Sequence, residues 1–176
     1  KIINKMLDDE YVTRSESGMI QIRNPDLILD MWHEAYDFDK HKVIKGNITA
    51  RSGDILLRKI SETLDEESID YSVTGLGAAW LYSRFAGFRI VTIYLREELS
   101  AQIYDKLLFR EDPRGANTWF VVPNDQGVFQ GSSRKDKINC VHPVQIYLDL
   151  KNHPERAKEA AEKLREEYLR WDDHAG

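Results

Sequence analysis

The chain has 176 residues, of which 41% are apolar and 31% are charged, and its formal net charge at pH 7 is −5. This composition fits one sizeable folded domain, or one domain with a small appendage, and it excludes a disordered chain. The negative net charge also excludes a protein that coats nucleic acid with its whole surface, so any DNA binding has to come from a local patch.

The sequence shows no sign of export or membrane insertion. No apolar run approaches the roughly 20 residues that cross a bilayer. The start of the chain, residues 1–5, lacks the apolar core of a signal peptide. Cys140 is the single cysteine, which excludes an intrachain disulfide. We therefore expect a cytoplasmic protein without a membrane anchor.

The first 40 residues are expected to form a helix, a hairpin and a second helix. Apolar side chains at helical spacing predict a helix over residues 1–7. Two short strands, 11–14 and 19–23, flank a polar turn in which Gly18 can adopt a positive φ. Asn24 and Pro25 are the cap and first-turn residues of the next helix. Its inward face is predicted to hold Leu27, Ile28, Met31, Ala35 and Phe38.

The rest of the chain alternates strands and helices. Strands are predicted over residues 43–49, 69–74, 88–95, 117–122, 128–130 and 138–141. Helices are predicted over residues 52–64, 78–85, 97–109, 143–151 and 154–171. The fold class is therefore α+β, with a partial winged helix over residues 1–40 and a mixed-sheet α/β domain over residues 41–176.

A helix followed at once by a short hairpin with a polar tip is the layout of a winged helix, which binds DNA through both elements. The predicted DNA-binding residues are Lys5, Arg14, Ser15, Ser17, Gly18 and Arg23. A purely structural hairpin is the alternative, because the four basic side chains of residues 1–24 are balanced by four acidic ones.

The segment 69–95 has the order strand, glycine-rich turn, helix, strand, which nucleotidyltransferases share. Those enzymes hold Mg²⁺ with two carboxylates on the second strand. Thr92 and Tyr94 stand at these positions here, and neither supplies an anionic oxygen. The sequence thus predicts a catalytically empty scaffold with no metal or cofactor. Gly75 and Gly77 are interpreted as positions of close helix–strand packing rather than as a phosphate loop.

Other groupings of reactive side chains allow weaker hypotheses. A metal cluster of His33, Asp37, Asp39 and His41 competes with a simple solvated connector. Cys140 and His142 could form a nucleophilic pair, but no third group orients the histidine. An active magnesium-dependent nucleotidyltransferase that uses Glu97, Glu98 or Asp105 remains an alternative function.

Two stretches carry a family resemblance. Residues 71–82 with 89–95, and residues 140–150 with 160–165, resemble the AbiEi family of antitoxins and transcriptional regulators from type IV toxin–antitoxin systems. The most specific part is Pro143-Val144-Gln145-Ile146-Tyr147-Leu148-Asp149-Leu150. The resemblance implies an N-terminal winged helix that represses the protein's own operon, and a C-terminal domain that opposes a toxin of nucleotidyltransferase type.

The predicted partners are therefore operator DNA and a cognate nucleotidyltransferase-like toxin, and the predicted function is non-enzymatic. The candidate partner-binding residues are Arg134, Lys135, Lys137, Gln145 and Asp149. The basic run is alternatively a solvated loop, and Gln145 and Asp149, four apart on one helix, could instead hydrogen-bond each other. A partner-binding module without a DNA role is the remaining alternative.

Overall fold

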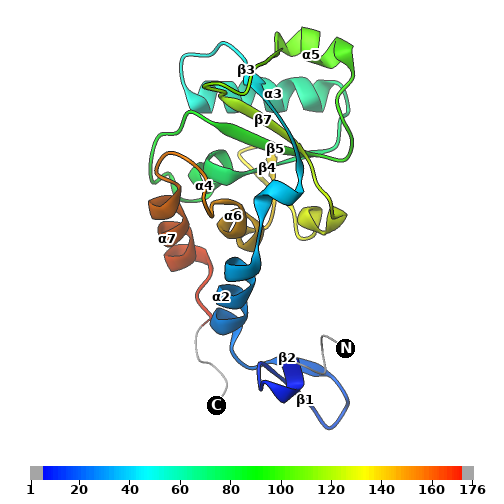
Figure 1. Cartoon of the computed structure of the whole chain (residues 1–176), viewed down its shortest axis with the longest axis vertical. Helices are drawn as coiled ribbons and strands as arrows, with labels where there is room; N and C mark the ends of the chain where they lie inside the picture. The colour runs from blue at the N-terminus through cyan, green and yellow to red at the C-terminus, as the bar shows by residue number, and fades with distance from the viewer. Residues whose placement is uncertain (1–5, 172–176) are drawn as a thin grey trace. The chain divides into compact units, whose positions relative to one another are not determined.

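The computed structural model describes residues 6–171 (Figure 1). It divides into two compact units. The smaller unit contains the described residues up to Tyr36 together with residues 170–171, and the larger unit spans Asp37–Leu169.

The smaller unit contains the predicted hairpin and the helix that follows it. Strands β1 (Val12–Arg14) and β2 (Ile20–Ile22) pair antiparallel. Helix α2 (Pro25–Ala35) begins with the predicted signals, because Asn24 accepts a hydrogen bond from the Leu27 amide at 3.0 Å and Pro25 occupies its first turn. These elements confirm the local prediction. Most of the helix predicted over residues 1–7 lies outside the described residues.

The predicted inward face of α2 is wrong. Leu29 is the buried residue of this helix, at 3% exposure. Leu27 and Met31, which were predicted to face inward, are each more than 40% exposed. Helical spacing therefore located the helix correctly but selected the wrong side of it.

The larger unit is built on a mixed sheet, as predicted. The sheet has seven strands in the order β6-β3-β7-β5-β4-β9-β8, and β6 and β8 were not predicted. The pairs β5–β7 and β4–β9 are parallel, and the other neighbours are antiparallel. The strands are β3 (Lys42–Asn47), β4 (Tyr71–Thr74), β5 (Val91–Leu95), β6 (Arg110–Glu111), β7 (Thr118–Val122), β8 (Ser133–Lys135) and β9 (Ile138–Cys140).

Five α-helices and two 3₁₀ turns surround this sheet in the described part of the larger unit (Figure 1). Helix α3 packs on β5 and β9, helix α6 packs on β4, and helix α4 contacts both α6 and α7. None of the helices described is long and apolar enough to cross a membrane. The helical elements are α3 (Gly53–Glu66), α4 (Gly75–Ser83), α5 (Ala101–Leu107), α6 (Pro143–Asp149), α7 (Ala157–Tyr168), η1 (Phe38–Lys40) and η2 (Gln126–Phe129).

The two central strands carry a row of hydroxyl groups on one face of the sheet. Ser72 pairs with Tyr94, and Thr74 with Thr92, across the antiparallel β4–β5 ladder. Because side chains alternate along a strand, these four share one face. All four are buried, at 2% exposure or less. The sheet therefore presents a buried polar surface, which α6 covers.

Three local predictions differ from the structure. Residues 128–130 do not form a strand, because the Asp125 side chain accepts a hydrogen bond from the Gly127 amide at 2.7 Å and starts the turn η2. Helix α5 begins at Ala101 rather than at residue 97, and it ends where Leu108 adopts a left-handed φ of 55°. The predicted basic loop is instead strand β8, at one edge of the sheet.

Candidate functional site

The tip of the N-terminal hairpin is a tight, internally bonded turn. The Ser15 and Ser17 hydroxyls are 2.7 Å apart, and the Met19 amide donates to Ser15 Oγ at 3.1 Å. Gly18 has the predicted positive φ, 81°. These contacts hold the tip in one shape, with Gly18 offering backbone that no side chain covers.

Two arginines flank this tip. Arg14 ends β1 and is exposed, and among the described residues it has no ion pair. Arg23 follows β2 and lies 3.5 Å from Glu10, with both side chains at least 60% exposed. Such an exposed pair is worth about 0–1 kcal/mol, so it does not prevent Arg23 from exchanging to a phosphate. Lys5, the remaining predicted contact, lies outside the described residues.

Asp149 of α6 is the centre of a buried polar network under the sheet. Its carboxylate accepts hydrogen bonds from Thr74 Oγ1 at 2.5 Å, from Tyr94 Oη at 2.9 Å and from Gln145 Nε2 at 2.9 Å. Asp149 itself is 1% exposed. A buried carboxylate is tolerated when donors surround it in this way, so Asp149 acts as an acceptor that ties α6 to β4 and β5.

His41 extends this network. Its Nδ1 accepts from the Asn124 amide at 3.2 Å, which leaves the proton on Nε2 to be donated to Tyr94 Oη at 3.1 Å. Tyr94 in turn donates to Asp149. Burial lowers the pKa of His41 below its ordinary value, which favours this neutral tautomer. The chain of donors thus runs in one direction, from Asn124 to Asp149.

The neighbouring hydroxyl, that of Thr92, also has a hydrogen-bond partner. Its Oγ1 lies 3.3 Å from Nε2 of His153, whose ring packs 4.9 Å from that of Trp119. Burial lowers the pKa of His153 as well. Gly75, at a φ of 62°, sits so close that an added Cβ would come within 3.3 Å of Thr92 Oγ1. The packing interpretation of Gly75 is therefore confirmed, whereas Gly77 makes only ordinary contacts, at 3.5 Å.

On the buried face of β5, Thr92 and Tyr94 are therefore hydrogen-bonded to imidazoles, and Tyr94 also bonds to the Asp149 carboxylate. Within residues 6–171, no three His, Cys, Asp or Glu side chains gather as metal ligands, and this includes the proposed set of His33, Asp37, Asp39 and His41. The alternative catalytic acids, Glu97, Glu98 and Asp105, are all exposed, and Glu98 pairs with Lys42.

Cys140 and His142 do not form a reactive pair. The Cys140 thiol is fully buried and points to the Ile138 carbonyl, and burial raises its pKa to about 12. His142 is instead the cap of α6, where its Nδ1 accepts from the Val144 amide at 3.2 Å. The thiol is thus protonated at neutral pH, and the imidazole has a structural role.

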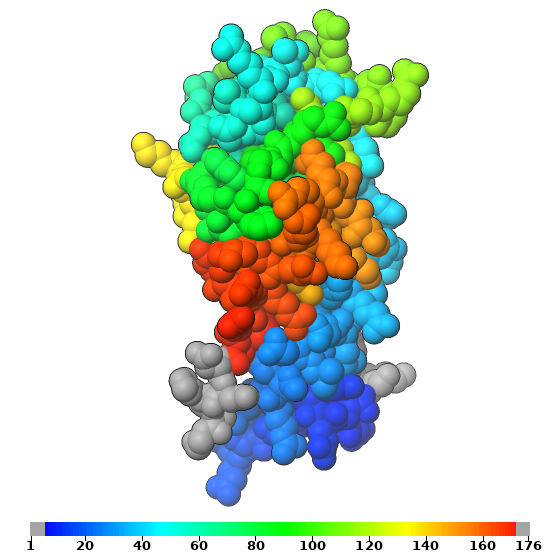
Figure 2. All heavy atoms as spheres, turned by 90° about the vertical axis from the view of Figure 1, so that its left-hand side faces the viewer, coloured from blue at the N-terminus to red at the C-terminus, as the bar shows by residue number. Residues whose placement is uncertain are grey.

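The candidate partner-binding residues fall into two groups. Arg134 and Lys135 lie on edge strand β8, and Lys137 is in the turn to β9, a hairpin that projects from the surface (Figure 2). Arg134 Nη2 contacts Asp65 Oδ2 at 3.1 Å, and Lys135 Nζ lies 4.6 Å from the centre of the Tyr82 ring. Gln145 and Asp149, by contrast, are buried and bond each other, which leaves little of either for a partner to touch.

Sequence reasoning did not predict the buried contacts of His41, which it considered only as a metal ligand, or those of His153. Their partners Tyr94 and Thr92 lie more than 50 residues away in the chain, so no local spacing pattern could have connected them.

Comparison with known proteins gives one match. The family model described as "Transcriptional regulator, AbiEi antitoxin, Type IV TA system" matches residues 21–170. No curated protein and no solved structure matches the chain. The matched region includes α2 and the whole larger unit, but it begins within β2, after the hairpin tip.

Proposed function

Because the chain belongs to the AbiEi family of transcriptional regulators and type IV antitoxins, we propose that it represses its own operon through the N-terminal hairpin and opposes a nucleotidyltransferase-like toxin through the larger unit. Both activities would take place in the cytoplasm, where operator and toxin are found. In this proposal the protein has no catalytic activity of its own.

The observation that carries the DNA half is the pair of exposed arginines beside a rigid polar tip. Arg14 and Arg23 can each neutralise a phosphate, and the backbone at Gly18 leaves room for close approach. The unit has the hairpin that a wing requires, and the helix α2 that follows it places acidic rather than basic side chains, Asp26, Asp30 and Glu34, along its length. Between the hairpin and α2, the hairpin is therefore the element whose charges suit DNA.

The test measures binding to the DNA upstream of the protein's own operon, by fluorescence anisotropy at several salt concentrations. Replacing Arg14 and Arg23 together by Ala should weaken binding and reduce the slope of log K against log salt by about 2, because each phosphate contact contributes roughly 0.9. Arg114→Ala is the matched control, since Arg114 is a 91% exposed arginine of the larger unit that pairs with Asp112. An unchanged slope in the double variant would place the DNA contacts on other residues, and absence of binding by the unaltered chain at low salt would support a partner-binding module without a DNA role.

The support for the non-enzymatic half is the set of hydrogen bonds around Thr92 and Tyr94. Thr92 and Tyr94 are engaged with His153 and with the His41–Asp149 network, so the positions of a metal site hold neutral, hydrogen-bonded groups. Co-expression with the product of the adjacent reading frame tests the antitoxin role: growth should be restored only when this chain is present. Nucleotide transfer by the purified chain with Mg²⁺, lost on replacing Glu97, Glu98 or Asp105, would favour the enzymatic alternative instead.

A further inference from the structure

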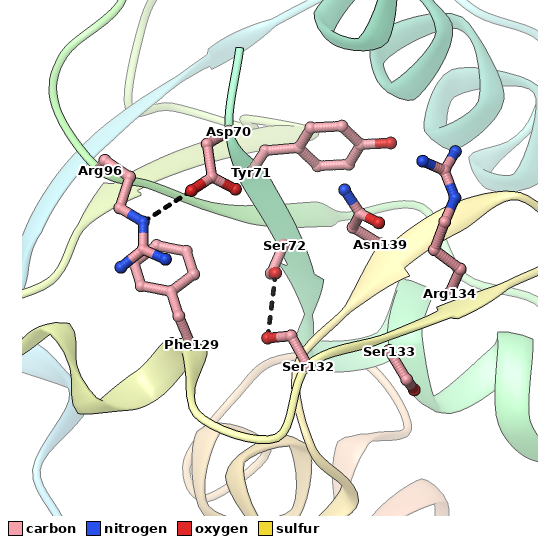
Figure 3. A pocket seen from close by; sticks show the side chains of 9 residues that line it. All are labelled: Asp70, Tyr71, Ser72, Arg96, Phe129, Ser132, Ser133, Arg134 and Asn139. Carbon is pink, nitrogen blue, oxygen red and sulfur yellow. Dashed lines mark hydrogen bonds and ion pairs between the residues drawn. The ribbon is translucent and has the colours of Figure 1, made fainter. Parts of the chain in front are cut away.

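A hollow of about 360 Å³ lies where β4, the β8–β9 hairpin and η2 meet (Figure 3). It is separate from the Asp149 network, and Arg134 is the one candidate partner-binding residue among those that line it. Its lining includes two arginines, three serines and an asparagine.

Arg96 lies on one side of the hollow and is held in place by three contacts. Its Nε donates to Asp70 Oδ2 at 2.8 Å, its Nη1 donates to Gln126 Oε1 at 3.1 Å, and its guanidinium stacks 3.9 Å over the Phe129 ring. Nη2 has no partner among the described residues. The group is thus preorganised while keeping donors for a ligand, as planar guanidinium groups do in anion sites.

Arg134 lies on the opposite side of the hollow (Figure 3). Its Nη2 donates to Asp65 Oδ2 at 3.1 Å and to the Lys137 carbonyl. Its Nε and Nη1 have no partner in the described part of the chain. Arg134 therefore repeats the pattern of Arg96: one carboxylate orients the guanidinium without occupying all of its donors.

Neutral polar groups lie between the two arginines. Ser72 Oγ donates to Ser132 Oγ at 3.2 Å, which leaves the Ser132 hydrogen available to a further acceptor. The Asn139 side chain, drawn between Tyr71 and Arg134 in Figure 3, makes no hydrogen bond within residues 6–171. These groups add donors along the floor of the hollow.

We propose that this hollow binds a small polyvalent oxyanion, such as the phosphate chain of a nucleotide or a tricarboxylate. Two arginines on opposite sides, each paired with only one carboxylate, call for a ligand with more than one negative group, and the hydroxyls and the amide between them suit its remaining oxygens. The volume fits a small molecule rather than a protein segment. Asp70 orients Arg96 by accepting its hydrogen bond. Because Asp70 is itself negatively charged, it repels the ligand and limits the affinity.

Isothermal titration calorimetry of the whole chain tests this site, with tripolyphosphate, ATP and citrate at constant ionic strength and without magnesium, and with adenosine as the uncharged probe. Arg96→Gln and Arg134→Gln should each weaken binding of the anions about tenfold or more, because each removes charge-assisted hydrogen bonds. Arg114→Gln should leave the affinity unchanged. If tripolyphosphate and ATP bind and citrate does not, the ligand is a phosphate compound. If citrate binds more tightly, the ligand is a tricarboxylate. Both results support the proposal.

Asp70→Asn tests the site by an expected gain of affinity, which a damaged fold could not produce. Removal of this charge should tighten binding several-fold, because Arg96 then faces the ligand without a competing carboxylate. Circular dichroism and thermal unfolding check that each variant folds. The proposal is overturned if none of the anions binds, or if Arg96→Gln, Arg134→Gln and Asp70→Asn all leave the affinity unchanged. Operator DNA plays no part in this experiment, so its outcome is independent of the proposed function.

Discussion

Tyr94 connects two halves of the buried network. Its hydroxyl donates to Asp149 and accepts from His41, so it acts as donor and acceptor at once. A polar cluster in a core is stabilising only while every member has its partner. Tyr94 is therefore a structural centre of the larger unit.

Replacing Tyr94 by Phe should lower the free energy of unfolding by about 1–3 kcal/mol. The substitution keeps the ring but removes the bond that His41 Nε2 donates and one of the two bonds that Asp149 Oδ1 accepts, and the loss of a buried hydrogen-bond partner costs about that much. Urea unfolding followed by circular dichroism measures the change.

Tyr168→Phe is the matched control for this substitution. The Tyr168 hydroxyl donates to the Tyr82 carbonyl at 2.8 Å from a side chain that is 44% exposed. Because water can replace this bond, the loss should stay below about 1 kcal/mol. Equal losses for the two variants would contradict the buried network.

At the residue scale, sequence reasoning succeeded where the partners are close in the chain. The absence of carboxylates at Thr92 and Tyr94 was visible in the sequence, and the bond between Gln145 and Asp149 follows from their spacing of four on a helix. The role of His41 depends on the fold, because its contacts come from strands and loops that only the tertiary structure brings together.

At the element scale, long periodic segments were predictable and short ones were not. Helix α3 and the buried strand β5 follow directly from their apolar patterns. Strand β8 has three residues, two of which are charged, and its pairing with β9 depends on the two-residue turn Asp136–Lys137, where both residues have a positive φ. Neither residue is a glycine, so the sequence carried no clear turn signal.

The junction between β4 and α4 depends on Gly75. We predict that Gly75→Ala lowers the free energy of unfolding by more than Gly115→Ala does. Both glycines have a positive φ, 62° and 65°, so both substitutions carry a backbone cost of about 1 kcal/mol. Only at Gly75 would the new Cβ also press on Thr92, whose hydroxyl is held by His153.

Chemical denaturation of the two alanine variants measures this difference. Gly115 has no heavy atom within 4 Å of the added Cβ, so its variant reports the conformational cost alone. A Gly75→Ala variant that is no less stable than Gly115→Ala would show that β4 and α4 have room to move apart.

At the scale of the whole molecule, the core is concentrated in the larger unit. Every one of the largest fully buried side chains belongs to Asp37–Leu169. In the described part of the smaller unit the buried apolar side chains are Val12 and Leu29, while Met19 and Ile22 are more than half exposed. A two-stranded hairpin with so little buried apolar surface contributes little stability of its own.

This distribution predicts how the chain responds to removal of its N-terminal part. A protein consisting of residues 37–171 keeps the seven-stranded sheet and helices α3 to α7, so it should retain a mixed α/β circular dichroism spectrum and unfold cooperatively. It should also bind the oxyanion as tightly as the whole chain, because the hollow is lined entirely by residues 70–139. Operator binding should be lost together with Arg14 and Arg23. Operator binding that survives this truncation would move the DNA-binding surface to the larger unit, where the basic hairpin of Arg134, Lys135 and Lys137 would be the first place to look for it.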